Sequence, residues 1–145
     1  WEVCMAGGYA AYYYTYTAWD VIRPDDEPPG YRLWANLAAF FSAMHFRLLR
    51  PADELVRIAE AGRGGNAIYC LANPGEEYVV FTNRPAAFEI SLEGARQFAG
   101  RWYDPFAGEW SEAGVFEPGT VRVEPPEHAP RQPTVLHLQH ESPES

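Results

Sequence analysis

The chain has 145 residues, of which 47% are apolar, and a formal net charge of −9. It contains 11 arginines and no lysine. This length allows one ordinary domain, or one small domain joined to part of another. The acidic charge repels phosphate backbones and no cluster of arginines offsets it, which excludes nucleic acid as a partner, and no apolar run reaches the roughly 18 to 20 residues of a membrane span.

The first expected elements are a short helix and an aromatic strand. Residues 1–5 favour a helix that ends at Gly7 and Gly8, because glycine is the usual residue just past a helix end. Residues 9–22 carry tyrosine, tryptophan and threonine, which are strand formers, at both odd and even positions. A strand with large apolar side chains on both faces is usually covered on both sides, so we expect this strand to lie inside a larger fold.

A loop, a helix and a hinge follow. Residues 24–30 combine three prolines with an acidic run and predict a loop. Apolar side chains then recur every three or four residues, which predicts an amphipathic helix over 31–49 that ends before Pro51, and a shorter helical turn is expected over 52–59. The glycine-rich segment 62–65 is the best domain boundary, because beyond it the apolar pattern changes from helical to alternating.

The remainder of the chain predicts short antiparallel strands separated by turns. An Asn-Pro-Gly turn at 73–75 and an Asp-Pro turn closed by Gly108 mark two of the turns. Six strands of this length and spacing predict a sandwich or an open barrel. We expect residues 141–145 to form a disordered tail. The expected strands are 67–72, 78–82, 87–92, 100–103, 120–123 and 134–139.

The strongest candidate for a binding site is the aromatic strand. Tyrosine and tryptophan rings offer flat apolar faces to a sugar ring, while a nearby carboxylate can accept hydrogen bonds from its hydroxyls. Filling a core is the alternative role for most of these tyrosines. Trp19 and Asp20 stand at the carboxyl end of the strand, where barrel enzymes place their ligands, so we predict Trp19, Asp20 and Tyr13 as substrate-binding residues.

Catalytic and metal-binding residues are harder to find in the sequence. Glycosidase chemistry needs two carboxylates about 5 to 9.5 Å apart, and Asp20 has no convincing second member, so we predict no catalytic residue in this chain. His137 and His140 beside Glu141 are more typical of plain surface than of a metal site, and we expect no metal and no cofactor. Cys4 and Cys70 are expected to be buried free thiols, with a disulfide as the alternative in a secreted protein.

Several segments of the chain resemble the carboxyl-terminal region of bacterial glycoside hydrolases of the apiosidase-like group. Trp102-Tyr103-Asp104-Pro105 with Gly108 is the most specific of them, and the family's Asp-Pro-Arg-Thr-Gly turn reads Asp-Pro-Phe-Ala-Gly here. The other resembling segments are 6–9 with Tyr13, 17–20, 29–31, 40–41, 69–72 and 77–80.

The resemblance implies an α+β fragment in two parts. Residues 1–60 would be the last strand and helices of a (β/α)8 barrel, and residues 64–140 a small antiparallel β-sandwich accessory domain that the family labels collagen-binding. In such enzymes the catalytic carboxylates come from earlier strands. The implied function is the C-terminal part of a glycoside hydrolase acting on complex carbohydrate, with the sandwich supporting the barrel by intramolecular packing.

A second hypothesis stays open beside the first. Trp102, Tyr103, Trp110 and Phe116 could instead belong to a non-catalytic carbohydrate- or matrix-binding module. The first hypothesis names carbohydrate as the partner and the second names carbohydrate or extracellular matrix, and neither involves nucleic acid or a membrane. A structural scaffold without ligands is the remaining alternative. The sequence leaves the location of the protein open, and a secreted or periplasmic protein is one alternative.

Overall fold

A computed structural model describes residues 1–11, 30–59, 65–127 and 133–140. There are two α-helices, α1 (Glu2–Met5) and α2 (Tyr31–Ser42). There are also two 3-10 helices: η1 (Phe46–Leu48) follows α2, and η2 (Asp53–Leu55) follows the first strand. The strands are β1 (Arg50–Pro51), β2 (Val56–Ile58), β3 (Ile68–Asn73), β4 (Glu77–Thr82), β5 (Phe88–Leu92), β6 (Phe98–Asp104), β7 (Glu109–Phe116), β8 (Gly119–Val123) and β9 (Thr134–His140).

The strands form two sheets in which every described pair is antiparallel. The larger sheet has six strands in the order β1-β3-β4-β9-β6-β7, and the smaller has three in the order β2-β5-β8. The register places Val80 of β4 between Cys70 of β3 and Leu136 of β9. The β3–β4 hairpin closes through the predicted Asn-Pro-Gly turn, where Gly75 has a φ of 84° and the Glu76 amide donates to the Asn73 carbonyl.

Side chains from both sheets share one core. Alternate residues of β4 and β9 point to this side, because successive side chains of a strand face opposite ways. Tyr78 is fully buried there, and its hydroxyl oxygen accepts hydrogen bonds from the backbone N–H groups of Gly75 and Glu93. The polar end of this buried side chain therefore has hydrogen-bond partners inside the core. The buried members of this inner core are Ala52, Val56, Cys70, Ala72, Tyr78, Val80, Phe88, Ile90, Leu92, Phe98, Trp102, Val123, Leu136 and Leu138.

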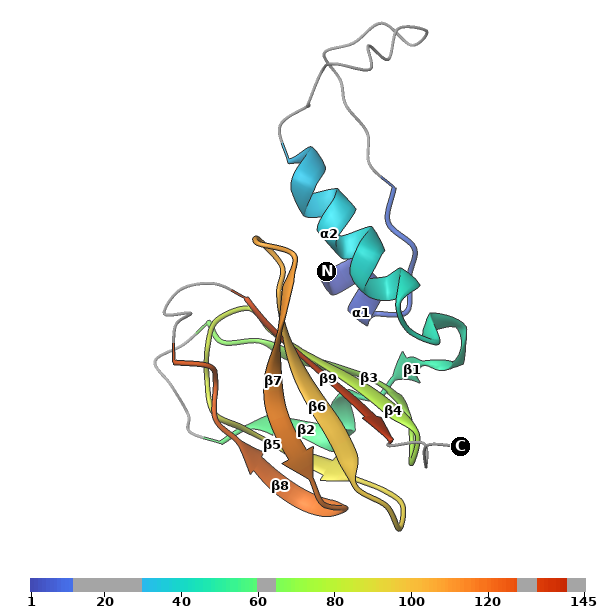
Figure 1. Ribbon diagram of the computed structural model, residues 1–145, viewed down its shortest axis with the longest axis vertical. Coiled ribbons are helices and arrows are strands. Elements are labelled where there is room, and N and C mark those ends of the chain that lie inside the picture. Colours follow the sequence, from blue (N-terminus) through green and yellow to red (C-terminus); the bar gives the residue numbers. More distant parts are fainter. Residues whose placement is uncertain (12–29, 60–64, 128–132, 141–145) are drawn as a thin grey trace, which may run out of the picture.

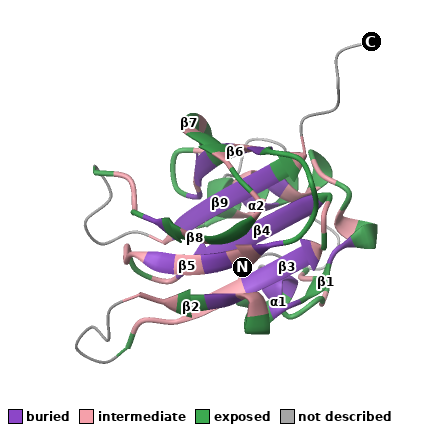
Figure 2. Cartoon of the chain, turned by 90° about the horizontal axis from the view of Figure 1, so that it is seen from below, coloured by how far each residue is buried: buried purple, intermediate pink, exposed green. Residues whose placement is uncertain are grey.

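The outer face of the larger sheet is covered by the two α-helices (Figure 1). All six residues of β4 are buried, and five of the seven residues of β9, so the centre of this sheet is enclosed on both faces (Figure 2). The smaller sheet lies on one side and α1 with α2 on the other. The buried members of the outer core are Met5, Phe40, Leu49, Leu71, Val79, Phe81, Tyr103 and Val135.

The described part confirms a mostly antiparallel β fold with few helices, and strands occur at all six predicted places. The helix expected over 31–49 ends at Ser42 instead, because the chain leaves the helical path at His45, whose backbone N–H is accepted by the Glu77 carboxylate. The helical turn expected over 52–59 is wrong in its second half: only 53–55 are helical, and Val56–Ile58 pair with β5. Strand β7 was not predicted.

Strands β1 and β2 lie before the glycine-rich segment, yet each pairs with a strand that follows it. The division into residues 1–60, 64–140 and 141–145 stays a prediction, and the expected tail lies outside the described residues. In the part of the chain that the structure describes, no helix is both long and apolar enough to cross a membrane.

Candidate functional site at the junction of helices and sheet

The residues predicted to bind substrate lie outside the described residues. Tyr13, Trp19 and Asp20 all fall within 12–29, so their role stays a prediction. The described chain nevertheless shows where the helical part meets the sheet, and this junction contains the most specific polar contacts between the two.

The first contact joins α2 to the Asp-Pro turn between β6 and β7. The side-chain amide of Asn36 donates to the carbonyls of Pro105 and Phe106, both at 3.0 Å. In return the hydroxyl of Tyr103 donates to the backbone carbonyl of Asn36 at 2.9 Å. These residues are 67 to 70 positions apart in the chain, so the three bonds fix α2 against the tip of one hairpin.

The turn itself is shaped by its own residues. The carboxylate of Asp104 accepts the backbone N–H groups of Phe106 and Ala107, which is the local pattern that makes aspartate common in turns. Gly108 closes the turn with a φ of 72°, a conformation that side-chain-bearing residues rarely adopt. A Cβ at Gly108 would stand 2.5 Å from the Asn36 side-chain oxygen, so glycine also leaves the room that the helix contact needs.

The second contact is a buried carboxylate beneath the end of α2. Glu77 on β4 is 3% exposed and accepts from His137 Nε2 on β9 at 2.7 Å. Its other oxygen accepts the backbone N–H of His45 and lies 3.3 Å from His45 Nδ1. Burial raises the pKa of Glu77, but its hydrogen bonds and charge interactions with His137 and His45 outweigh burial and leave that pKa below its ordinary value.

The position of His137 differs from the surface location that we expected. Its side chain is 3% exposed, and its ring lies 6.3 Å from the Phe40 ring and 5.9 Å from the Trp110 ring. His140 is partly exposed beside Arg96, and Glu141 lies outside the described residues. Within the described ranges, no group of three or more His, Cys, Asp and Glu side chains is placed to hold a metal ion.

The four rings proposed for a binding module are used in packing. Trp102 is 9% exposed in the inner core, and Tyr103 is 3% exposed beneath α2. Trp110 stacks on Phe40 at 5.3 Å and is covered by the Arg101 guanidinium at 4.4 Å. Phe116 lies over Gly100, where an added Cβ would be 2.3 Å from its ring. These rings therefore form no open platform for a sugar.

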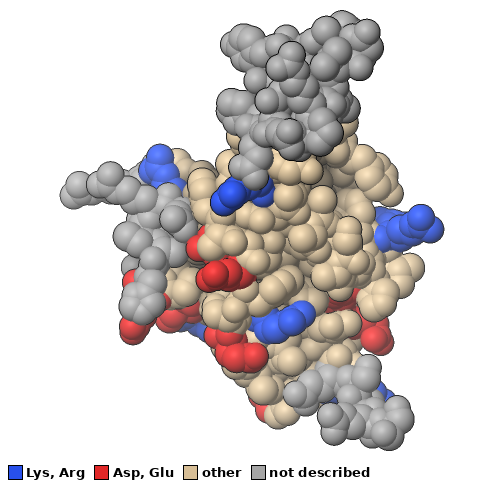
Figure 3. Space-filling view, turned by 45° about the horizontal axis from the view of Figure 1, so that its top comes forward, with Lys and Arg blue, Asp and Glu red and all other residues tan. Residues whose placement is uncertain are grey.

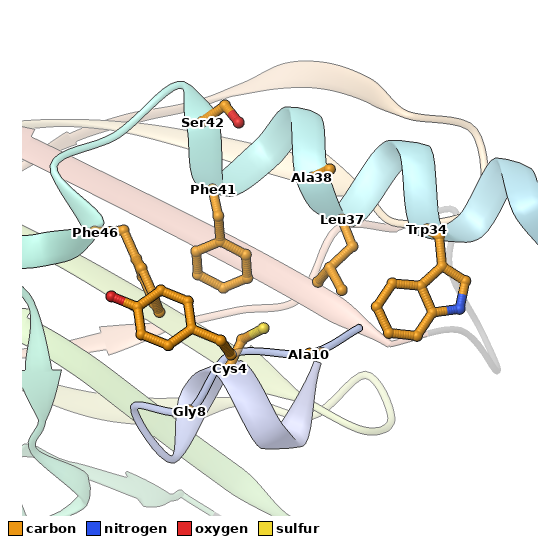
Figure 4. A pocket seen from close by; sticks show the side chains of 10 residues that line it. Cys4, Gly8, Ala10, Trp34, Leu37, Ala38, Phe41, Ser42 and Phe46 are labelled. Atoms are coloured by element: carbon orange, nitrogen blue, oxygen red, sulfur yellow. The ribbon is translucent and has the colours of Figure 1, made fainter. Parts of the chain in front are cut away.

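The space between the two helical segments is hollowed. A groove of about 280 Å³ runs between the α1 segment and α2. Figure 4 shows Trp34, Leu37 and Phe41 reaching from α2 toward the segment that carries Cys4, Gly8 and Ala10. No charged side chain among the described residues lines it. The described residues that line it are Cys4, Gly8, Tyr9, Ala10, Trp34, Leu37, Ala38, Phe41, Ser42 and Phe46.

Large apolar side chains are exposed mainly in the helical part. Of the seven large exposed ones among the described residues, only Phe106 and Val115 come from the larger sheet and its hairpin. Figure 3 shows a broad uncharged area with acidic and basic side chains around it. The distribution marks the helical part as the less completely covered half of the chain. The other five are Val3, Tyr9, Tyr31, Leu33 and Leu48.

Both cysteines are buried and free, as the sequence predicted. Burial, with smaller contributions from the carboxylates of Asp53 and Glu54, raises the pKa of the Cys70 thiol far above its usual range. A thiol in this state is a poor nucleophile, so Cys70 has a packing role.

Sequence reasoning missed Asn36, Glu77 and His137 as junction residues. Asn36 is a polar residue on the apolar side of a predicted helix, and Glu77 and His137 are charged or titratable residues inside apolar strands. A polar side chain that is buried needs a hydrogen-bond partner, so a polar residue inside an apolar pattern was the signal that could have identified these three residues.

No protein-family model matches the chain, and no curated protein matches it significantly. Solved structures share its fold, and two of them are described as follows. One is described as a glycoside hydrolase, with a TM-score of 0.65 and 17% identity over 85% of this chain. The other is a glycoside hydrolase of family 5 from Bacteroides vulgatus ATCC 8482, with a TM-score of 0.66 and 15% identity over 79% of this chain. The chain spans 31% and 25% of the length of these two proteins.

Proposed function

We propose that this chain is the C-terminal part of a glycoside hydrolase acting on complex carbohydrate. The helical segments within residues 1–60 supply the end of its (β/α)8 barrel, and the β-sandwich over 64–140, which β1 and β2 extend, supports that barrel. The apiosidase-like group is the specific family that we propose, on the resemblance of the Trp102–Gly108 segment. Trp19, Asp20 and Tyr13 are the proposed substrate-binding residues, and the catalytic carboxylates belong to another part of the enzyme.

The two-sided environment of the helical part carries this proposal. Toward the sheet, α2 is fixed by Phe40, Tyr103 and Asn36, which is the contact of a support. On its side toward the α1 segment, the same helix lines a groove whose described residues are uncharged, and the helical part exposes large apolar side chains. Exposed apolar surface of this kind marks a face that another part of a protein covers. The two similar structures are glycoside hydrolases three to four times longer than the matched region, which agrees with a missing larger part.

The proposal predicts that the 145-residue chain associates with itself or binds a hydrophobic dye when it is produced alone. Size-exclusion chromatography with light scattering and the fluorescence of 8-anilinonaphthalene-1-sulfonate measure these two properties. Replacing Tyr31 and Leu33 with serine should reduce both signals. The matched control is Val115→Ser, which removes an equally exposed apolar side chain from β7.

A monomeric chain with no dye binding would contradict the proposal. So would an equal reduction by the Val115→Ser control, since apolar exposure would then not be specific to the helical part. The binding-module alternative receives no support from Trp102, Tyr103, Trp110 or Phe116, because all four rings are packed in the described structure.

A further inference from the structure

A second hollow lies at the C-terminal end of α2, where the chain turns toward the sheet. It is an open basin of about 700 Å³, and sites for small molecules have volumes of about 300 to 1,000 Å³. Its lining comes from the segment after α1, the end of α2 and the turn into η1. The lining residues are Tyr9, Phe41, Ser42, Met44, His45, Phe46, Arg47 and Leu48.

Aromatic rings form much of this lining. Phe41 and Phe46 pack edge to face with ring centroids 4.9 Å apart, and Tyr9 meets Phe46 in the same way at 5.6 Å. Phe41 and Phe46 are therefore held by their neighbours. Tyr9 is 81% exposed, so much of its ring and its hydroxyl are open to solvent. An open phenol ring can take the apolar face of a sugar while its hydroxyl bonds to the sugar's polar groups.

Two side chains of the basin, His45 and Arg47, are basic. Among the residues that the structure describes, no carboxylate lines it, although the whole chain carries a net charge of −9. Nδ1 of His45 faces Glu77, which leaves Nε2 of the exposed ring for a ligand. Arg47 is exposed, and no partner of its guanidinium lies among the described residues. An arginine and a histidine in this setting favour an anion, and the planar guanidinium matches a carboxylate well.

We propose that this basin binds a carboxylate-bearing sugar, such as a uronic acid unit of a polysaccharide. The sugar ring lies against Tyr9, and its carboxylate accepts hydrogen bonds from the Arg47 guanidinium and, when the His45 ring carries both protons, from Nε2 of His45. The inference goes beyond the proposed hydrolase function, because it needs only described residues and no catalytic group. A basin with rings alone would suit a neutral sugar, and it is the basic pair that selects an acidic one.

The test is saturation-transfer NMR on the 145-residue chain with galacturonic acid, galactose and benzoate as separate probes. This method observes the ligand, so it also works if the chain associates with itself. We expect transfer to galacturonic acid and little to galactose. Arg47→Gln should weaken galacturonic acid binding about tenfold, the loss of a charge-assisted hydrogen bond. Arg84→Gln is the matched control, since it removes the same charge beyond the far end of β4.

Three results would overturn the proposal. One is the absence of transfer to galacturonic acid at millimolar concentration, and a second is equal binding by the Arg47→Gln and Arg84→Gln variants. The third is binding of benzoate without galacturonic acid, which would make the basin a site for aromatic acids. Each of these leaves the proposed hydrolase function intact, because that function rests on the groove and on the contacts between helix and sheet.

Discussion

Replacing Asn36 with alanine tests the contact by which the sheet holds α2. The change removes both side-chain hydrogen bonds to the Asp-Pro turn and leaves the Tyr103 bond to the backbone in place. Each lost bond contributes about 1 kcal/mol. Alanine offsets about 0.6 kcal/mol of this loss in unfolding free energy, because it has a higher helix propensity than asparagine. One of the two bonds is exposed and counts for less, so we expect a net loss of about 1 kcal/mol.

The assay is urea unfolding followed by far-UV circular dichroism, with thermal unfolding as a second measurement. For a chain of this size the expected fall in Tm is about 3 °C. Two further variants separate the contact from helix propensity. Ser42→Ala changes an exposed residue at the end of α2 and should leave stability unchanged or raise it slightly. Asn36→Asp keeps the shape of the side chain but cannot donate, so it should cost more than Asn36→Ala.

The reasoning is refuted if Asn36→Ala is as stable as Ser42→Ala. It is also refuted if Asn36→Asp unfolds at the same urea concentration as the unchanged chain, because the two carbonyls of the turn would then not need the amide donor. Hydrogen exchange offers a local check. Loss of the contact should lower protection of the α2 amides before it lowers protection of the β4 amides.

Three further predictions concern the sheets. The pKa of Glu77 in the folded chain lies below its ordinary value near 4.5, so the stability that its carboxylate contributes is present above that pH and is lost as the pH falls below it. Glu77→Gln should therefore flatten this part of the curve of stability against pH. An unchanged slope would exclude Glu77 as the cause. Gly100→Ala should cost about 1 to 3 kcal/mol in urea unfolding, since its Cβ would meet the Phe116 ring, and a neutral result would mean that the ring moves freely. Cys70 should react with a thiol reagent only after unfolding, as burial suppresses its thiolate, and rapid labelling of the native chain at this position would contradict that burial.

The predictable part of the fold is the part encoded in short-range patterns. The strands β3, β4 and β9 have runs of branched and aromatic residues, and Asn73-Pro74-Gly75 marks the hairpin between two of them. Strand β7 lacks such a run. It contains Ser111, Glu112 and Gly114 and lies at an edge of the sheet, where a single neighbouring strand constrains the sequence.

The end of α2 and the junction residues could not be predicted, because long-range partners determine them. The apolar period continues past Ser42 to Leu48, so nothing local ends the helix. The partner that accepts the His45 N–H is Glu77, 32 residues further along the chain. Asn36 likewise finds its acceptors about 70 residues away. The predicted binding residues Tyr13, Trp19 and Asp20 lie outside the described ranges.

The burial of β4 on both faces links the helices and the sheets in one folding unit. Tyr78 and Val80 need the smaller sheet to cover them, while Val79 and Phe81 need α1 and α2. Removing the helices would expose the second set, and each large apolar side chain costs about 1.5 to 3 kcal/mol when it moves from core to water. Native stability is only about 5 to 15 kcal/mol, so the sheets alone would be left close to unfolding. A domain with its own core can fold alone, whereas this pattern of burial makes the sheets depend on the helices for their stability.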